Sequence, residues 1–589
     1  MKDFFKYTLA TVTGIILTSV IVFILSIVTF VGMLSGTESE TPVKKNSIMK
    51  LEFNGALSER SQDNPFEQFL GDNYTTYGLD DILSSIQKAK EHDDIKGIYI
   101  EANYLSSSFA SRQEIRNALA DFKTTGKFIV AYGDAYTQGL YYLSSIADKV
   151  LLNPKGKVEW RGLSSNPVFY KELLDKLGVE MQIVKVGTYK SAVEPFIDKE
   201  MSDANREQIT AYINSVWNTL LTDISESRNI SKDSLNMIAD KMLMFYQSEE
   251  NVKYGLVDTL IYKNDVRDYL KEMVGVDKDS RLPVLGLSQM KNVKKNVPKD
   301  KSGNIVAVYY AYGSIDMGSS GFGTEEGIVS NEVIRDLRKL KEDKNVKAVV
   351  LRVNSGGGSA FGAEQMWKAV EELKKEKPVV VSMGDYAASG GYYMACNADC
   401  IVAEPTTLTG SIGVFGMIPN MSGLMKKIGI SFDMAKTNKY ADFGAPGRGL
   451  NNDEKTLLQM MVNEVYDLFL TRCSEGRNIS KEELAKIAEG RIWTGAMAKE
   501  LGLVDELGGL DKALEIAAGK AEIENYTVLG YPAKKDFFSS LIEEKPTNYI
   551  QSQILRSNLG DFYKDFSFIK SLEEADVLQA RLPFELNID

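Results

Sequence analysis

The fold of this chain is decided by two stretches that align with each other without a gap. They are KFIVAYGDAYTQGLYYLSSIADKVLLNP at residues 127–154 and PVVVSMGDYAASGGYYMACNADCIVAEP at residues 378–405. Working outward at the same offset of 251 residues, IKGIYI at 95–100 aligns with VKAVVL at 346–351. Self-similarity at a fixed offset is the sequence signature of a repeated unit. The chain therefore consists largely of two copies of one domain.

Within each copy, short runs of valine and isoleucine alternate with amphipathic stretches. The runs at 98–100 and 379–381 are typical of buried strands, whereas EVIRDLRKLKE at 332–342 has the apolar spacing of a helix. Alternating strands and helices predict an α/β fold with a buried, largely parallel sheet in each copy.

We expect six segments along the chain. They are an N-terminal transmembrane anchor (1–36), a polar tether (37–47), a first repeat (48–286), an exposed linker (287–304), a second repeat (305–531) and a C-terminal extension (532–589). The linker is predicted from its lysine run, proline and glycine. The extension matches nothing in the first copy and receives no predicted role.

The composition excludes several classes of function. Of 589 residues, 44% are hydrophobic and 25% are charged, which is typical of a globular protein. The net charge of −12 lacks the basic excess that nucleic-acid binding requires. The single histidine, His92, excludes a multi-histidine metal site, and the three cysteines form no Cys-x-x-Cys pair. We therefore expect no nucleic acid and no metal site built from several histidines or from a cysteine cluster, and any catalytic base is expected to be a residue other than histidine.

The N-terminal segment predicts a membrane span. Residues 7–34 carry no charge over 28 positions, which exceeds the ~20 residues that a helix needs to cross a bilayer core. Lys2 and Lys6 precede the span and favour a cytoplasmic N-terminus, with the rest of the chain on the other side. We expect an uncleaved, single-pass anchor, with an unusually long signal peptide as the alternative.

The two copies differ where chemistry is expected. In the second copy, LRVNSGGGS at 351–359 and MGDYAASGGYY at 383–393 each follow an apolar strand. The second stretch places Ser389 at a strand-to-helix turn, where backbone N–H groups point outward. The first copy has Gln138 at the aligned position and IEANYLSSS in place of the glycine run. A nucleophile with oxyanion donors is therefore predicted in the second copy only.

A candidate base shows the opposite distribution. Lys190 lies in the first copy, in VGTYKSAVEPF, and the second copy has Ala441 at the same offset. A lysine serves as a general base if burial or positive charge lowers its pKa from about 10.4 to near neutrality. One copy is therefore predicted to hold the serine and the other the lysine.

A purely structural explanation stays open for these residues. AASGG also fits close packing of a helix on a strand, and GGG also fits a plain tight turn. The complementary loss of features in the two copies favours catalysis over these alternatives.

Four motifs carry a resemblance to a known family. NSGGGS (354–359), GDYAASGGYY (384–393), LTGSIGVFG (408–416) and VGTYKSAVEPF (186–196) resemble those of signal peptide peptidase A, also called protease IV, in its long, duplicated form. The resemblance covers nearly the whole chain. It implies two tandem repeats of a fold similar to that of the Clp protease and crotonase group.

The same resemblance implies roles for individual residues. Ser389 would be the nucleophile, Lys190 the general base, and Ser411 the hydroxyl that orients the lysine. Backbone N–H groups of Gly390 and Gly357 would form the oxyanion hole. The family usually has proline where this chain has Gly356, so the choice between Gly357 and Gly358 stays open.

The resemblance also implies a membrane-anchored serine endopeptidase that needs no metal and no cofactor. Its substrates would be signal-peptide remnants and similar apolar peptides, cleaved in the cell envelope through an acyl-enzyme. The chain would be anchored in the inner membrane with its catalytic part in the periplasm, and it would assemble into a homo-oligomer, expected to be a tetramer. The rival hypotheses are a crotonase-like acyl-thioester enzyme and an inactive membrane-anchored scaffold.

Overall fold

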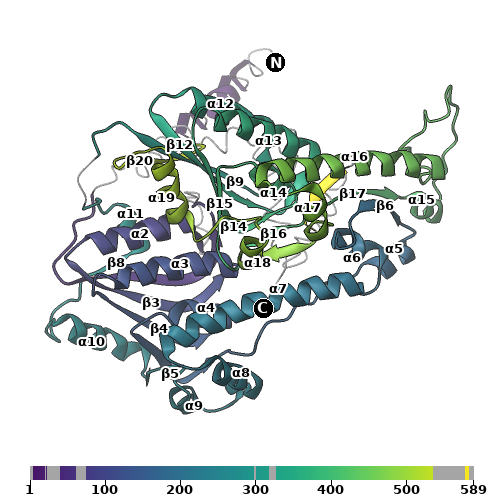
Figure 1. Ribbon diagram of the computed structural model, residues 1–589. Coiled ribbons are helices and arrows are strands. Elements are labelled where there is room, and N and C mark those ends of the chain that lie inside the picture. Colours follow the sequence, from purple (N-terminus) through teal and green to yellow (C-terminus); the bar gives the residue numbers. More distant parts are fainter. Residues whose placement is uncertain are drawn as a thin grey trace.

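A computed structural model describes most of the chain. It covers residues 4, 6–8, 10–19, 21–22, 40–61, 75–296, 300–317, 327–534 and 578–582. The two copies form two α/β units that lie side by side, each built on its own sheet (Figure 1). A third sheet takes strands from both copies.

The first unit is built on a seven-stranded sheet in the order β2-β1-β3-β4-β5-β7, with β8 paired to β1. Every pairing in it is parallel. Its strands are β1 (Ser47–Ser58), β2 (Thr75–Gly78), β3 (Ile95–Ser106), β4 (Phe128–Tyr136), β5 (Lys149–Val158), β7 (Thr259–Leu260) and β8 (Val284–Gly286).

Both faces of this sheet are covered, which explains why its strands are apolar at successive positions. Ile129 of β4 belongs to the core that helices α2 and α3 share, whereas the next residue, Val130, packs with Leu270 of α10 on the opposite face. The helical segments of this unit are α2 (Leu79–Glu91), α3 (Phe109–Lys123), α4 (Gln138–Ser144), α5 (Lys171–Leu177), η1 (Ser191–Val193), α6 (Glu194–Ile197), α7 (Asp203–Arg228), α8 (Lys232–Lys241), η2 (Leu243–Phe245), α9 (Ser248–Lys253), α10 (Lys263–Val274) and α11 (Leu287–Lys291).

The second unit repeats this plan on an eight-stranded sheet in the order β18-β16-β14-β12-β9-β20, with β15 between β14 and β19. The pairings are parallel except that of β16 with β18. Its strands are β9 (Ile305–Tyr312), β12 (Val346–Ser355), β14 (Val379–Ala388), β15 (Cys400–Ala403), β16 (Leu408–Gly410), β18 (Ile492–Thr494), β19 (Glu506–Leu507) and β20 (Thr527–Tyr531). Its helices are α12 (Ser330–Glu342), α13 (Ala360–Lys374), α14 (Gly390–Ala395), α15 (Ser422–Lys427), α16 (Asn452–Arg477), α17 (Lys481–Ile487), α18 (Gly495–Glu500) and α19 (Leu510–Lys520).

The duplication is visible in matching elements of the two units. Helices α7 and α16 have the same length of 26 residues, and each ends at an asparagine in the left-handed conformation, Asn229 and Asn478. Asparagine tolerates this conformation better than most residues because its short polar side chain bonds locally. Both the predicted α/β class and the predicted repeat are therefore observed in the structure.

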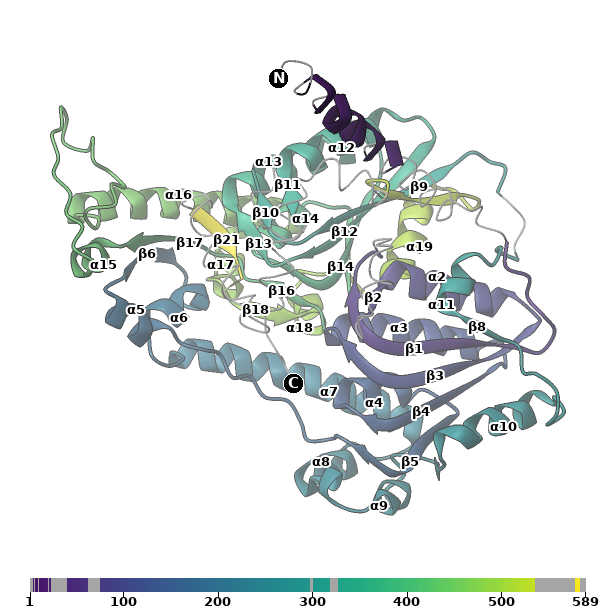
Figure 2. The same cartoon turned by 180° about the vertical axis from the view of Figure 1, so that it is seen from behind.

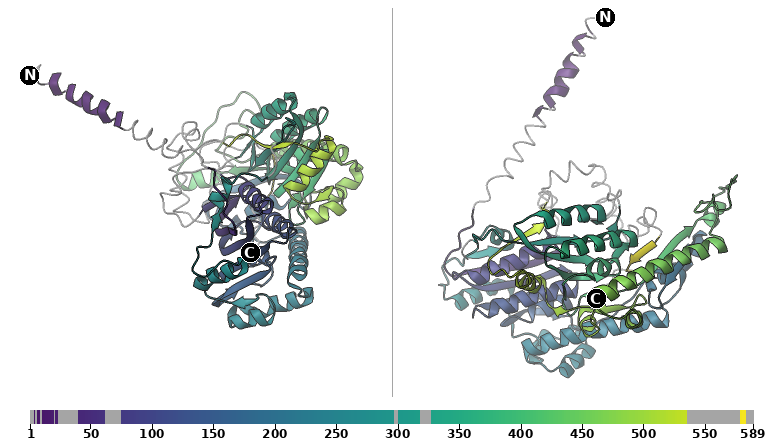
Figure 3. Two further views of the ribbon diagram at one scale, coloured as in Figure 1. Left: turned by 90° about the vertical axis from the view of Figure 1, so that its left-hand side faces the viewer. Right: turned by 45° about the horizontal axis from the view of Figure 1, so that its top comes forward.

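The third sheet joins the units and runs in the order β11-β10-β13-β21-β17-β6. Its strands are β6 (Glu180–Val186) of the first copy, β10 (Ile315–Asp316), β11 (Ile328–Val329), β13 (Gly357–Ser359) and β17 (Val414–Asn420) of the second, and β21 (Leu578–Arg581) of the C-terminal extension. Helix α16 packs on β6 and β17, and together they project from the body of the molecule (Figure 3).

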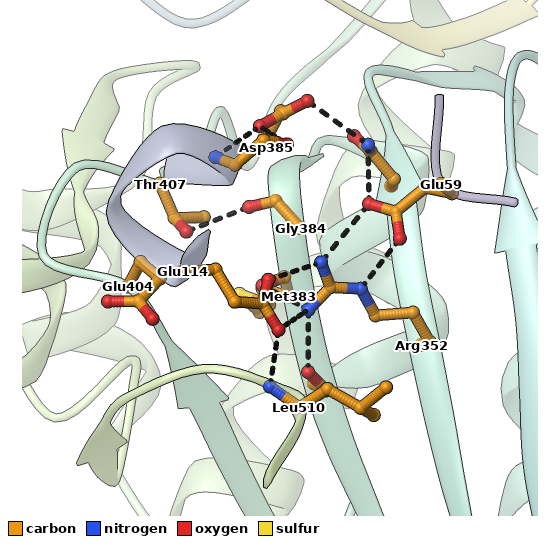
Figure 4. A network of polar contacts seen from close by, with 12 residues as sticks. Glu59, Glu114, Arg352, Met383, Gly384, Asp385, Glu404, Thr407 and Leu510 are labelled. Carbon is orange, nitrogen blue, oxygen red and sulfur yellow. Dashed lines mark hydrogen bonds and ion pairs between the residues drawn. The ribbon is translucent and has the colours of Figure 1, made fainter. Parts of the chain in front are cut away.

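A buried ion cluster also holds the two units together. Arg352 of β12 donates to Glu59 at 2.9 Å and to Glu114 of α3 at 2.7 Å (Figure 4). Arg352 is 1% exposed, and it also donates to Ser382 of β14 at 2.9 Å. One arginine of the second unit is thus shared by two carboxylates of the first.

The start of the predicted linker differs from the structure. Residues 287–291, expected at the start of an exposed linker, form helix α11, which packs on α2 and β1 with Met290 fully buried. The apolar Met290 among lysines explains this, since it completes the first core. In the C-terminal extension, Leu578–Arg581 form strand β21 of the third sheet.

The predicted membrane span at 7–34 lies partly outside the described residues. Among the helices that the structure describes, none is long and apolar enough to cross a bilayer. The anchor therefore stays a prediction.

Candidate active site

Ser389 lies between β14 and α14, at the strand-to-helix turn that the sequence predicts. Its φ of 55° is one that a non-glycine residue rarely adopts and that costs backbone energy. The turn is held on both sides, because the Ser389 N–H donates to the Gly410 carbonyl and the Tyr393 N–H donates to the Ser389 carbonyl, each at 2.8 Å. The strained turn therefore holds one buried hydroxyl in a fixed place.

Lys190 reaches this serine because the two copies share a sheet. Strand β6 of the first copy pairs antiparallel with β17 of the second, from Val186 opposite Val414 to Glu180 opposite Asn420. Lys190 follows β6 by four residues, at the start of the 3₁₀ turn η1. Residues 199 positions apart in the chain are thereby brought together.

The amine of Lys190 makes three polar contacts. Its Nζ lies 2.8 Å from Ser389 Oγ, 3.0 Å from Ser411 Oγ and 3.2 Å from the Ser411 carbonyl oxygen. A neutral amine has two hydrogens and one lone pair. If both hydrogens are donated to Ser411, the lone pair faces the hydroxyl of Ser389, which is the arrangement that proton abstraction requires.

Burial sets the protonation of this amine. Lys190 is 1% exposed, and desolvation lowers its pKa to about 7. Loss of hydration destabilises the charged ammonium form, and no carboxylate of the described residues opposes the effect. A large fraction of Lys190 is therefore neutral at physiological pH.

Ser411 also lies in a turn with a positive φ and a bonded backbone N–H. It lies between β16 and β17 with a φ of 51°, and its N–H donates to the Arg491 carbonyl at 2.7 Å. The hydroxyl predicted to orient the lysine is thus next to the lysine amine.

A loop that the sequence analysis missed supports Lys190 from the other side. The Gly490 N–H donates to the Ile412 carbonyl at 2.8 Å, and a Cβ on Gly490 would lie 2.7 Å from the backbone N and Cα of Lys190. Gly490 has a φ of 79°, so both its conformation and its surroundings require glycine. Comparison of the copies could have found it, since IAEGR (487–491) aligns with IADKM (238–242), which has no glycine.

The glycines predicted to form the oxyanion hole are neighbours. A Cβ on Gly357 would lie 2.8 Å from the Gly390 nitrogen. The Gly357 N–H donates to Ser355 Oγ at 3.1 Å, and Gly358 is the next residue along the same strand. The donor role of Gly357 therefore stays a prediction, with Gly358 as the alternative.

The C-terminal strand β21 lies against the same glycines. Its Ala580 carbonyl oxygen would be 1.9 Å from a Cβ on Gly357 and 3.0 Å from a Cβ on Gly390. The sequence analysis had assigned no role to this segment.

These contacts define what the site can do. A hydroxyl, a neutral amine and adjacent backbone N–H groups lie together in a buried place, and such a group suits acyl transfer through a serine ester.

Comparison with known protein families agrees with this chemistry. The model of peptidase family S49 matches the chain twice, over residues 121–277 and 371–524, once in each copy. A shorter match, to a CoA-ligase family, covers residues 309–387.

Comparison with individual proteins extends the likeness along the chain. Protease 4 of Haemophilus influenzae is 35% identical over 515 residues, which are 84% of this chain and 82% of that protein. The chloroplastic serine protease SPPA of Arabidopsis thaliana is 31% identical over 484 residues, which are 82% of this chain and 70% of that protein. A putative signal peptide peptidase SppA of Enterococcus faecium is 34% identical over 226 residues, which are 38% of this chain and 66% of that protein.

Proposed function

Because the chain belongs to peptidase family S49 and is a serine peptidase, we propose that Ser389 is its nucleophile and Lys190 its general base. The observation that carries the proposal is the 2.8 Å contact between Lys190 Nζ and Ser389 Oγ, made across the two copies in a buried site. Neither copy holds both groups, so each copy alone would be inactive.

In the proposed reaction, neutral Lys190 takes the proton of Ser389 as its Oγ attacks a peptide carbonyl carbon. The Ser411 hydroxyl and carbonyl accept the N–H groups of the lysine and thereby direct its lone pair at the serine. The protonated lysine then gives its proton to the leaving amine. Water, deprotonated by the same lysine, hydrolyses the serine ester.

The tetrahedral oxyanion would be stabilised by backbone N–H groups on the two sides of the serine. We propose Gly390 as one donor and Gly357 as the other, with Gly358 as the alternative because the Gly357 N–H donates to Ser355 Oγ in this structure. Preorganised donors of this kind are worth roughly 3 kcal/mol each in a water-excluded site.

We further propose that the substrates are apolar peptides, including signal-peptide remnants. The support is the name of the Enterococcus faecium relative and the location of the predicted span at residues 7–34. An anchor there would hold the site close to membrane-derived peptides in the cell envelope and raise their effective concentration. The same proposal includes three further points. The chain is anchored in the inner membrane with its catalytic part in the periplasm, and it assembles into a homo-oligomer. Each repeat is related in fold to the Clp protease and crotonase group.

The decisive experiment compares hydrolysis of an apolar peptide by the full chain and by the variants Ser389→Ala and Lys190→Met. Matched controls replace a buried serine and a buried lysine away from the site, as Ser144→Ala and Lys88→Met. Both site variants are expected to lose at least about 10³-fold in kcat, whereas folded control variants keep kcat within a few-fold.

Full activity of folded Lys190→Met would overturn the proposed base. A chain that hydrolyses no peptide but processes acyl thioesters would favour the crotonase-like alternative. A serine-directed acyl probe gives a second readout, because a peptidase should be labelled at Ser389 and an inactive scaffold should not.

A further inference from the structure

Helix α7 of the first copy contributes a buried amide side chain next to the proposed base. The helix passes beside β18 of the second copy, at the boundary between the two units (Figure 2). Gln208 lies in the second turn of α7 and is 2% exposed. A buried amide needs hydrogen-bond partners for both its nitrogen and its oxygen, so the partners of Gln208 show which segments it holds together.

The amide nitrogen of Gln208 bonds to both neighbours of Lys190 in the chain. Nε2 donates to the Tyr189 carbonyl at 3.1 Å and to Ser191 Oγ at 3.0 Å. It also lies 3.1 Å from Asn205 Oδ1, in the preceding turn of α7. The residues on each side of the lysine are therefore tied to the same helix.

The amide oxygen of Gln208 bonds to the other copy. Its Oε1 accepts the Ile492 N–H at 3.2 Å. Ile492 begins β18 and lies opposite Gly410 in the antiparallel pair of β18 with β16. The Gly410 carbonyl in turn accepts the Ser389 N–H at 2.8 Å. A continuous set of contacts therefore runs from the serine turn to the amide, and from the amide to the backbone around Lys190.

The far end of the lysine segment is held by the same helix. Asn205 Nδ2 donates to Glu194 Oε2 at 2.8 Å, and the hydroxyl of Ser202, the N-cap of α7, donates to Glu194 Oε1 at 2.6 Å. Glu194 is the first residue of α6, four residues after Lys190. These bonds fix residues 189–194 on α7, and Gln208 adds the link to the second copy.

The two copies differ at this position of the helix. Because α7 and α16 have the same length, Gln208 aligns with Leu457 of α16. Leu457 is 51% exposed. The second copy, which has Ala441 in place of the lysine, thus has no amide here. The buried amide belongs to the copy that holds the lysine, which is the distribution expected of a group that serves the lysine.

We propose that Gln208 is a positioning residue for the reaction and that it sets the distance between the Lys190 amine and Ser389 Oγ. This inference rests on the proposed function, because it assigns Gln208 a role that acts through Lys190. The amide has no contact with the reacting atoms. It holds the backbone of the base to the strand pair of the second copy that also holds the serine turn.

The physical reason is the length of the lysine side chain. Its amine is at the end of a flexible four-carbon stem, so its place depends on the backbone from which the stem starts. Proton transfer from Ser389 requires a short contact, which is 2.8 Å here. Without the amide, the lysine segment loses its bond to β18, and the two halves of the dyad can move apart.

The test measures kcat and KM of the full chain for an apolar peptide in Gln208→Met and in a matched control, Gln113→Met. Gln113 is also a buried glutamine, 4% exposed, and its Oε1 also bonds across the copies, to the Thr406 N–H at 3.3 Å and hydroxyl at 2.8 Å. Both variants are expected to lose Tm, because methionine has a similar length but forms none of these bonds. Only Gln208→Met is expected to lose about 100-fold in kcat, with KM within a few-fold of the wild type.

A double variant shows whether the effect passes through the lysine. The rate at which a serine-directed acyl probe labels Ser389 is compared in Lys190→Met and in Lys190→Met combined with Gln208→Met. We expect equal rates, because a residue that acts only through Lys190 has no effect once the amine is gone. A further fall in the double variant would show that Gln208 affects the serine by another route and would overturn the proposal.

The kinetic outcomes separate this inference from the proposed function. If Lys190→Met is inactive but folded Gln208→Met keeps the kcat of Gln113→Met, the positioning role is overturned and the proposed function stands. A higher KM with unchanged kcat would overturn it as well, since it would assign Gln208 to substrate binding. Full activity of Lys190→Met would overturn the proposed function itself. Gln208→Asn, which carries the amide on a side chain one carbon shorter, replaces Gln208→Met if that variant does not fold, and it has to show the same loss of kcat without a change in KM.

Discussion

At the scale of single residues, the proposed catalysis depends most on the surroundings of Lys190. It lies in the first copy, but every polar partner of its amine belongs to the second. Its burial supplies a base without a histidine, and the low pKa comes from desolvation alone rather than from a neighbouring cation.

The first prediction concerns the pH dependence of hydrolysis. Only neutral Lys190 accepts a proton, and its pKa is about 7. We expect kcat/KM for a peptide to rise about tenfold per pH unit below pH 7 and to level off above it. A stopped-assay profile from pH 5 to 10 checks this. A profile that is flat through pH 7 would contradict the assignment of Lys190 as the base.

The second prediction concerns stability. The folded protein releases the Lys190 proton at about pH 7, whereas the unfolded chain holds it to about 10.5. Between these two pH values the unfolded state binds more protons than the folded state, so this group makes the free energy of unfolding rise with pH. Below pH 7 the full destabilisation caused by burying Lys190 remains. This destabilisation is on the order of 5 kcal/mol.

Lys190→Met should therefore raise the free energy of unfolding at pH 7 by a few kcal/mol while removing activity. Lys88→Met provides the contrast. Burial also lowers the pKa of Lys88, but the carboxylates of Asp81 and Glu91 oppose the effect, so loss of its hydrogen bonds to the carbonyls of Met290 and Lys291 should destabilise the chain. Urea unfolding of the three proteins measures the difference. A less stable Lys190→Met protein would show that its burial carries no such cost.

At the scale of elements, the site depends on short segments that hold residues in unusual conformations. Lys190 follows strand β6, and Ser389 lies in the turn after β14. The loop at Gly490 packs against the lysine backbone, so the lysine position is determined by a loop of the other copy.

The third prediction separates backbone strain from catalysis in this loop. Gly490→Ala and Gly502→Ala both place a side chain on a backbone with φ near 75°, which costs roughly 1–2 kcal/mol. A Cβ on Gly490 would meet the Lys190 backbone at 2.7 Å, whereas one on Gly502 would meet only Ile479 Cδ1, at 3.4 Å. We expect both variants to lose Tm, Gly490→Ala more because its Cβ also meets backbone, and we expect a fall in kcat of about 100-fold or more for Gly490→Ala alone. Equal kinetics of the two variants would sink the role of this loop.

At the scale of the whole molecule, catalysis requires that the two copies keep their relative position. The serine and the lysine come from different units, which are joined by the third sheet and by the Arg352 cluster. Removing the arginine would leave the buried carboxylates of Glu59 and Glu114 without their shared cation.

The fourth prediction follows from this cluster. Arg352→Ala should cost roughly 3–5 kcal/mol and lower Tm by about 5–15 °C, with loss of peptide hydrolysis. Arg335→Ala is the control, since the Arg335 side chain is 58% exposed in its ion pair with Asp336, and it should change Tm little. Calorimetry of both variants measures the effect. A small shift for Arg352→Ala would mean that the third sheet alone holds the units together.

The sequence by itself determined the duplication, the α/β class, the serine at a strand-to-helix turn and the lysine in the other copy. These features are local or repeated, since strand and helix periodicity, glycine runs and aligned differences can be read along the chain. Only the tertiary structure shows three other features. They are the shared sheet that brings Lys190 to Ser389, the loop at Gly490, and the C-terminal strand beside the serine. Each of them depends on contacts between residues far apart in the chain, and pairing of distant strands leaves no periodic signal in a single sequence.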